Sequence, residues 1–101
     1  MNKRNDTIFA LATPTGKSAI AVIRISGIDA INVVNKISLN FPKTDKLATL
    51  NTIIKNKKEK IDQSITTIFK SPKSYTGENM VEMSAHGGAA VIGKIIKTLD
   101  L

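Results

Sequence analysis

Two charged residues interrupt segments that otherwise have the character of apolar β-strands. Arg24 lies within Ala19–Ser26, and Glu82 lies within Met80–Ala85. A buried charge costs free energy unless an opposite charge or a hydrogen-bonding group pairs with it. The two side chains could neutralise each other across a sheet, or Arg24 could reach a sheet edge and extend its head group into water. Alternatively, both could point into one ligand pocket, and the residues alone leave these explanations open.

A shared pocket would have a definite chemistry. The carboxylate of Glu82 offers two acceptors, which suit a flat heterocycle with adjacent N–H donors. The guanidinium of Arg24 offers a rigid fork of donors for a carbonyl or a carboxylate. The chain shows no Ser-His-Asp set and no carboxylate pair of the kind that glycosidases use. We therefore predict binding and orientation of a ligand at these residues, and no covalent or hydrolytic catalysis.

His86 precedes a Gly87-Gly88 turn at the end of the predicted strand, in the kind of place where ligands gather in α/β sheets. The backbone N–H groups of Gly87, Gly88 and Ala89 could bind an anion at the start of the following helix. The other explanation is that His86 is a satisfied turn residue and that the glycines let helix and strand approach closely. From the residues alone, we favour this second explanation.

A different glycine-containing segment, Gly16-Lys17-Ser18, is similar to the end of a phosphate-binding P-loop. The complete motif needs a glycine where this chain has Leu11, and it needs a helix afterwards. The segment Ala19–Ser26 that follows has the pattern of a strand. The chain is therefore not expected to bind a nucleotide through a P-loop.

The composition bounds the remaining possibilities. A chain of 101 residues with 42% hydrophobic and 23% charged residues is typical of one globular domain. It has no cysteine and one histidine, which argues against disulfides and a zinc site. It has no apolar run of about 18 residues and no signal peptide, so we expect a cytoplasmic protein without a membrane partner.

The net charge of +7 favours anionic partners. Four of the lysines fall in one predicted turn, which could contact RNA or could simply be a soluble hairpin tip. Those residues are Lys55, Lys57, Lys58 and Lys60.

Hydrophobic periodicity and turn residues indicate an α+β domain with the order β-β-α-β-β-β-α and a mixed sheet of about five strands with two helices. The first helix should begin at Ser26 or Asp29 and run to about Leu39, because Phe41-Pro42 ends it. The predicted strands are Thr7–Ala12, Ala19–Ser26, Ala48–Lys55, Asp62–Lys70 and Met80–Ala85, and the second helix starts at Ala89.

Three segments together resemble the amino-terminal domain of the tRNA-modification GTPase MnmE (TrmE) family. They are Asp6–Gly16 (DTIFALATPTG), Ile20–Gly27 (IAVIRISG) and Ser71–Gly88 (SPKSYTGENMVEMSAHGG). The resemblance covers both ends of the chain, and the stretch from Asp29 to Lys70 carries little of it.

The resemblance implies a fold similar to the folate-binding domain of the glycine-cleavage aminomethyltransferase. It implies a homodimer and a bound tetrahydrofolate derivative, in the 5-formyl or methylene form, as one-carbon donor. By motif match, Arg24 and Glu82 are folate-contacting positions. The Ser74–Asn79 loop and the His86-Gly87-Gly88 turn would shape the pocket.

Members of the family are potassium-stimulated GTPases that act with the flavin-dependent partner MnmG (GidA) on the wobble uridine of tRNA. Their GTP, Mg²⁺ and K⁺ sites belong to a G domain, and a further folate-contacting lysine belongs to a later motif. Neither matches anything in residues 1–101. We therefore expect this chain to be a single domain of a longer protein, without GTPase activity of its own.

Overall fold

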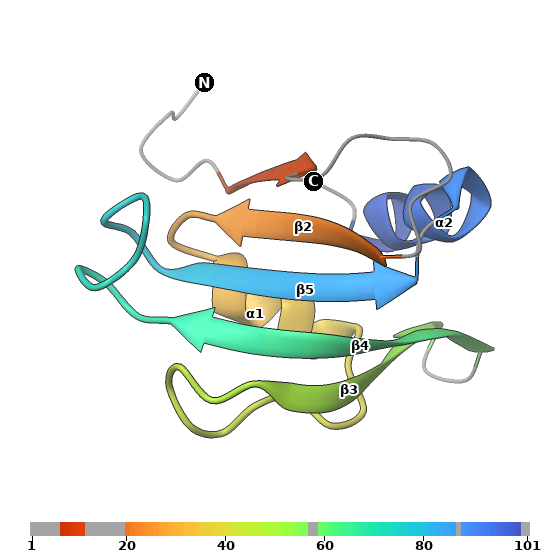
Figure 1. Cartoon of the computed structure of the whole chain (residues 1–101), viewed down its shortest axis with the longest axis horizontal. Helices are drawn as coiled ribbons and strands as arrows, with labels where there is room; N and C mark the ends of the chain where they lie inside the picture. Colours follow the sequence, from red (N-terminus) through yellow and green to blue (C-terminus); the bar gives the residue numbers. More distant parts are fainter. Residues whose placement is uncertain (1–6, 12–19, 57–58, 87, 100–101) are drawn as a thin grey trace.

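The computed structural model describes residues 7–11, 20–56, 59–86 and 88–99. Within them the order of elements is β-β-α-β-β-β-α, which confirms the predicted order and the α+β class (Figure 1). The elements are β1 (Ile8–Leu11), β2 (Ile20–Ser26), α1 (Ala30–Lys36), β3 (Thr49–Lys55), β4 (Glu59–Phe69), β5 (Met80–His86) and α2 (Ala89–Leu99).

The five described strands form one sheet in the order β1-β2-β5-β4-β3. Every strand pair in it is antiparallel, whereas the sequence predicted a mixed sheet. The last strand, β5, lies at the centre between β2 and β4 (Figure 1). Two strands that are distant in the sequence, β2 and β5, are therefore paired in the middle of the sheet.

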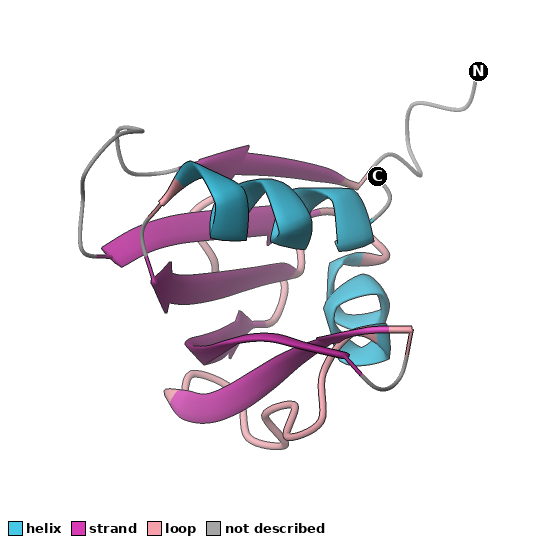
Figure 2. Ribbon diagram, turned by 90° about the vertical axis from the view of Figure 1, so that its right-hand side faces the viewer, coloured by secondary structure: helices cyan, strands magenta, loops and turns pink. Residues whose placement is uncertain are grey.

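Both helices pack against one face of this sheet. The strands direct alternate side chains to that face, as the period of two requires, and Ile23, Val81 and Met83 are fully buried there. Val34 of α1 and Ile95 of α2 belong to the same core. Figure 1 shows α1 behind β5 and β4. Figure 2 is seen from the right-hand side of Figure 1, and in this view α2 crosses in front of the strands.

The first helix ends at Lys36, earlier than the predicted end near Leu39. The next residues turn toward the sheet, because Ser38 forms an isolated antiparallel bridge with Ile53 of β3. The hydroxyl of Ser38 also donates a hydrogen bond of 2.6 Å to the carbonyl of Val34. Asp29 occupies the N-cap position as predicted, but its side chain makes no capping hydrogen bond.

A polar cluster is built into the covered face beside this helix end. Asn51 is fully buried, and its amide nitrogen donates to the hydroxyls of Ser38 (2.8 Å) and Thr66 (3.3 Å). Its amide oxygen accepts the backbone N–H of Asn40 at 3.0 Å. Ser64 and Thr66 share a further hydrogen bond of 2.8 Å. The cluster connects the chain after α1 with β3 and β4.

Neither of the helices described here is long and apolar enough to span a membrane.

Candidate ligand site on the open face of the sheet

Arg24 and Glu82 are directly opposite each other on the two central strands. The antiparallel register of β2 and β5 pairs the two residues, and Arg24 Nε donates to Glu82 Oε2 at 3.0 Å. Their side chains are 40% and 26% exposed, because both point away from the helices. The structure thus brings together the two charged residues that the sequence singled out.

This ion pair leaves hydrogen-bonding capacity unused. The guanidinium reaches Glu82 through Nε alone, so neither terminal NH₂ group of Arg24 bonds to a described residue. Oxygen Oε1 of Glu82 likewise has no partner among the described residues. A bidentate Arg–carboxylate pair would use both oxygens. The observed pair can accept a third group without first being broken.

Two aromatic rings continue the site beyond the ion pair. The Arg24 guanidinium lies 4.9 Å from the centroid of the Tyr75 ring, a cation–π contact. The rings of Tyr75 and Phe69 are tilted by 49°, with their centroids 6.1 Å apart. Tyr75 itself is 75% exposed. The rings therefore form an accessible apolar surface next to two charges.

The loop that carries Tyr75 is fixed to the end of β2. The hydroxyls of Ser26 and Thr76 share a hydrogen bond of 2.7 Å. The N–H of Gly27 donates to the carbonyl of Asn79 at 3.0 Å, and the side-chain oxygen of Asn79 accepts the N–H of Ser71 at 2.9 Å. These contacts position the aromatic ring over Arg24.

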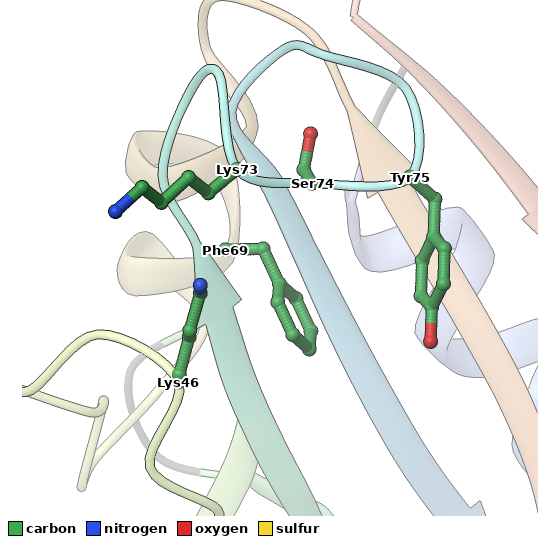
Figure 3. A pocket seen from close by; sticks show the side chains of 5 residues that line it. All are labelled: Lys46, Phe69, Lys73, Ser74 and Tyr75. Atoms are coloured by element: carbon green, nitrogen blue, oxygen red, sulfur yellow. The ribbon is translucent and has the colours of Figure 1, made fainter.

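A recess of about 490 Å³ opens between this loop and the end of β4. It is lined by Lys46, Phe69, Lys73, Ser74 and Tyr75 (Figure 3). Phe69 is two residues along β4 from Thr67, the residue paired with Glu82. The recess therefore begins one row of side chains, about 7 Å, from the ion pair.

His86 makes a different kind of pair. Its Nδ1 lies 2.7 Å from Asp62 Oδ1, and its backbone N–H donates to Asp62 Oδ2 at 2.8 Å. Both oxygens of this carboxylate are thus bound within the protein, although the imidazole is 72% exposed. These contacts agree with His86 as a satisfied turn residue.

At Gly88, after His86, glycine is required by the backbone conformation rather than by close packing. Gly88 has a φ of +121°, a conformation that side-chain-bearing residues rarely adopt, and an added Cβ there would meet no atom within 4 Å. Gly87 lies outside the described residues, so binding of an anion by this turn stays a prediction.

Two other predicted features fall partly or wholly outside the described residues. The segment Gly16-Lys17-Ser18, which we excluded as a P-loop, belongs to the stretch 12–19 that is not described. In the lysine-rich turn, residues 57–58 are not described, whereas Lys55 at the end of β3 pairs with Glu59, and Lys60 of β4 pairs with Ile54. The structure adds neighbours from α2, since Lys94 and Lys97 line a shallow surface recess together with Lys55.

Sequence reasoning missed four residues of these sites. It did not assign Lys46, Phe69 and Lys73 to the recess, and it did not identify Asp62 as the partner of His86. Asp62 could have been identified from the sequence, because it is a charged residue within a predicted strand, as Glu82 is. Lys46 could not have been identified in this way, since it comes from a loop that is distant in the sequence from the other residues of the recess.

The fold and the site together define a small α+β domain with helices on one face of an antiparallel sheet and a charged, aromatic-lined recess on the other. The described residues contain no cluster of His, Asp or Glu able to hold a metal ion. A family model described as "GTP-binding protein TrmE N-terminus" matches residues 7–100. The chain belongs to this family.

Curated relatives agree with that assignment. The chain is 44% identical over 97 residues to the tRNA modification GTPase MnmE of Anaplasma marginale, which covers 96% of this chain and 22% of the relative. It is 43% identical over 91 residues to the MnmE of Thermotoga maritima, covering 90% of this chain and 20% of the relative. The chain thus spans about a fifth of the length of the curated relatives it matches.

Proposed function

We propose that this chain is the tetrahydrofolate-binding and dimerisation module of a tRNA-modifying GTPase. The observation that carries the proposal is the Arg24–Glu82 pair, which lies at the centre of an uncovered sheet face with unused acceptor and donor groups. Both residues lie in the segments that resemble the family motifs. The ligand when bound would supply a one-carbon unit, and this chain would hold and orient it.

The residues fit a reduced pteridine. Its ring edge presents adjacent N–H donors, which match the acceptors of Glu82. The terminal NH₂ groups of Arg24 can donate to its carbonyl oxygen, and Tyr75 offers an aromatic surface that already lies against Arg24. The 5-formyl and methylene forms of tetrahydrofolate share this edge, so either satisfies the proposal.

The other activities belong to the longer protein that we propose as its parent. That protein would bind GTP, Mg²⁺ and K⁺ in a separate G domain and would act in the cytoplasm with MnmG and tRNA. It would take part in aminomethyl-type modification of the wobble uridine. This chain would contribute the folate site and the contact between protomers.

Calorimetric titration with 5-formyltetrahydrofolate tests the site. Glu82→Gln removes the charge while keeping nearly the same shape, and a lost hydrogen bond to a charged group should weaken binding roughly 10- to 100-fold. Glu59→Gln makes the same chemical change at the exposed start of β4 and should bind like wild type. Equal affinities of wild type and Glu82→Gln, or no binding by wild type, would contradict the proposal.

A second candidate is a purely structural dimerisation domain. It is favoured by four large apolar side chains on the uncovered face, each more than 40% exposed: Ile8, Ile20, Leu50 and Ile65. This candidate predicts a dimer in sedimentation and no heat in the folate titration. A double change of the paired residues Leu50 and Ile65 to serine should then shift the chain toward monomer.

A third candidate is a tRNA-contacting module. It is favoured by the position of Lys94 and Lys97 beside Lys55, which extends the lysine-rich turn onto α2. It predicts tRNA binding that weakens steeply with salt and is lost when these lysines become glutamines. Salt-independent or absent binding would exclude it.

A further inference from the structure

The recess beside Tyr75 carries two lysines that the Arg24–Glu82 site does not use. Lys46 comes from the connection between α1 and β3, and Lys73 comes from the loop between β4 and β5. Neither ammonium group has an acidic partner among the described residues. The two positive charges are therefore available to an anionic ligand.

The backbone at Lys46 is built into this position. Lys46 has a φ of 63°, which is uncommon for a residue other than glycine. Its N–H donates to the carbonyl of Ile68 at 2.8 Å, and the neighbouring Asp45 accepts the N–H of Lys70 at 3.0 Å. These two bonds attach the connection to the end of β4. Lys46 is thereby held at the edge of the recess.

The groups follow one another in a definite order along the open face. Glu82 and Arg24 come first, Tyr75 lies against Arg24, and Phe69 lies against Tyr75. Figure 3 shows the Phe69 ring between Tyr75 on one side and the two lysines on the other. The spatial order of groups along the open face is thus a charged pair, an aromatic surface and then two positive charges.

We propose that this recess binds the anionic tail of a polyglutamylated folate. A folate has the matching order of groups: a pteridine, a benzoyl ring and then γ-linked glutamates. The benzoyl ring would pack against Phe69, and carboxylates of successive glutamates would pair with Lys46 and Lys73. The inference rests on the proposed function and adds to it a preference for ligands with several glutamates.

The size of the preference follows from the exposure of the lysines. Ion pairs in contact with water are individually weak, and two of them together should strengthen binding of a triglutamate over a monoglutamate roughly three- to tenfold. Because solvent-exposed charges are screened, this advantage should shrink as salt is raised.

The test is a calorimetric titration of the full chain with 5-formyltetrahydrofolate in its monoglutamate and triglutamate forms. Wild type should bind the triglutamate roughly three- to tenfold more tightly. The double variant Lys46→Gln/Lys73→Gln should lose most of that advantage and retain tight binding of the monoglutamate. Lys94→Gln/Lys97→Gln removes the same charge from α2 and should keep the advantage.

Each other outcome overturns the inference in a recognisable way. If wild type binds both ligands equally, the tail preference is wrong while the proposed function stands. If the advantage survives in Lys46→Gln/Lys73→Gln, the tail is bound elsewhere. If neither ligand binds to wild type, the proposed function and this inference fail together.

Discussion

The two faces of the sheet use polar side chains in opposite ways. On the helix-covered face, Asn51 is fully buried and its amide oxygen and nitrogen are all engaged within the protein. On the open face, Arg24 and Glu82 meet through one hydrogen bond and leave other donors and acceptors without a described partner. A polar cluster that satisfies itself stabilises a fold, and one that does not is suited to binding.

The same contrast separates two side-chain pairs that involve β5, Arg24–Glu82 and Asp62–His86. Asp62 uses both carboxylate oxygens on His86, one of them on its backbone. Glu82 uses one oxygen on Arg24. His86 was a candidate for the site in the sequence, yet its contacts are those of a satisfied structural residue. Completeness of hydrogen bonding therefore distinguishes these sites better than residue type does.

The largest expected effect on stability is at Ile23, and it is best measured against Ile20, an isoleucine of β2 on the opposite face of the sheet. Ile23 is fully buried, so Ile23→Ala should lower the free energy of unfolding by about 2 to 5 kcal/mol. Ile20 is 58% exposed, so Ile20→Ala should lower it by less than about 1 kcal/mol. Urea denaturation measures both, and similar losses would show that the open face is covered in solution.

Truncation of the buried amide should have the next largest effect. Asn51→Ala leaves Ser38, Thr66 and the N–H of Asn40 without their partner, which should cost about 1 to 3 kcal/mol of stability. The control is Asn32→Ala on the exposed side of α1, which should be neutral or slightly stabilising. Equal unfolding midpoints for the two variants would refute a structural role for this cluster.

The ion pair on the open face should matter little for stability. Since Arg24 and Glu82 remain accessible to water, Glu82→Gln should change the free energy of unfolding by no more than about 1 kcal/mol. The same variant is expected to lose folate affinity. A large loss of stability, with ligand binding unchanged, would show that the pair stabilises the fold and does not bind the ligand. The contrast between the two faces would then be wrong.

Small effects are also expected at the end of β5. Asp62→Ala removes the acceptor of the His86 backbone N–H and should cost about 1 kcal/mol. His86→Ala keeps that bond and should cost less than about 0.5 kcal/mol, because the imidazole is largely exposed. If His86→Ala instead weakened ligand binding as much as Glu82→Gln does, His86 would belong to the ligand site.

Local patterns in the sequence were sufficient to predict the order of elements and the unusual status of Arg24 and Glu82. The short, mostly apolar segments and the turn residues beside them predicted both strands correctly, and the two charges stood out against that apolar background. The direction of the strands was predicted less well, because it depends on the insertion of β5 between β2 and β4. That pairing joins distant segments, and no local pattern encodes it.

The error in the predicted end of α1 and the failure to identify Lys46 have a similar cause. The helix stops at Lys36 because Ser38 pairs with Ile53 of a later strand, and propensity does not report such competition. Lys46 reaches the recess through its bond to Ile68. Both are long-range contacts, so they become visible only in the folded chain.

The most direct test of the proposed folate site is a crystal structure of this chain with 5-formyltetrahydrofolate. We predict that the pteridine ring will lie on the open face within hydrogen-bonding distance of Glu82, with Arg24 donating to the same ligand. A ligand bound elsewhere, with Arg24 and Glu82 still paired only to each other, would contradict the assignment of these two residues to the folate site.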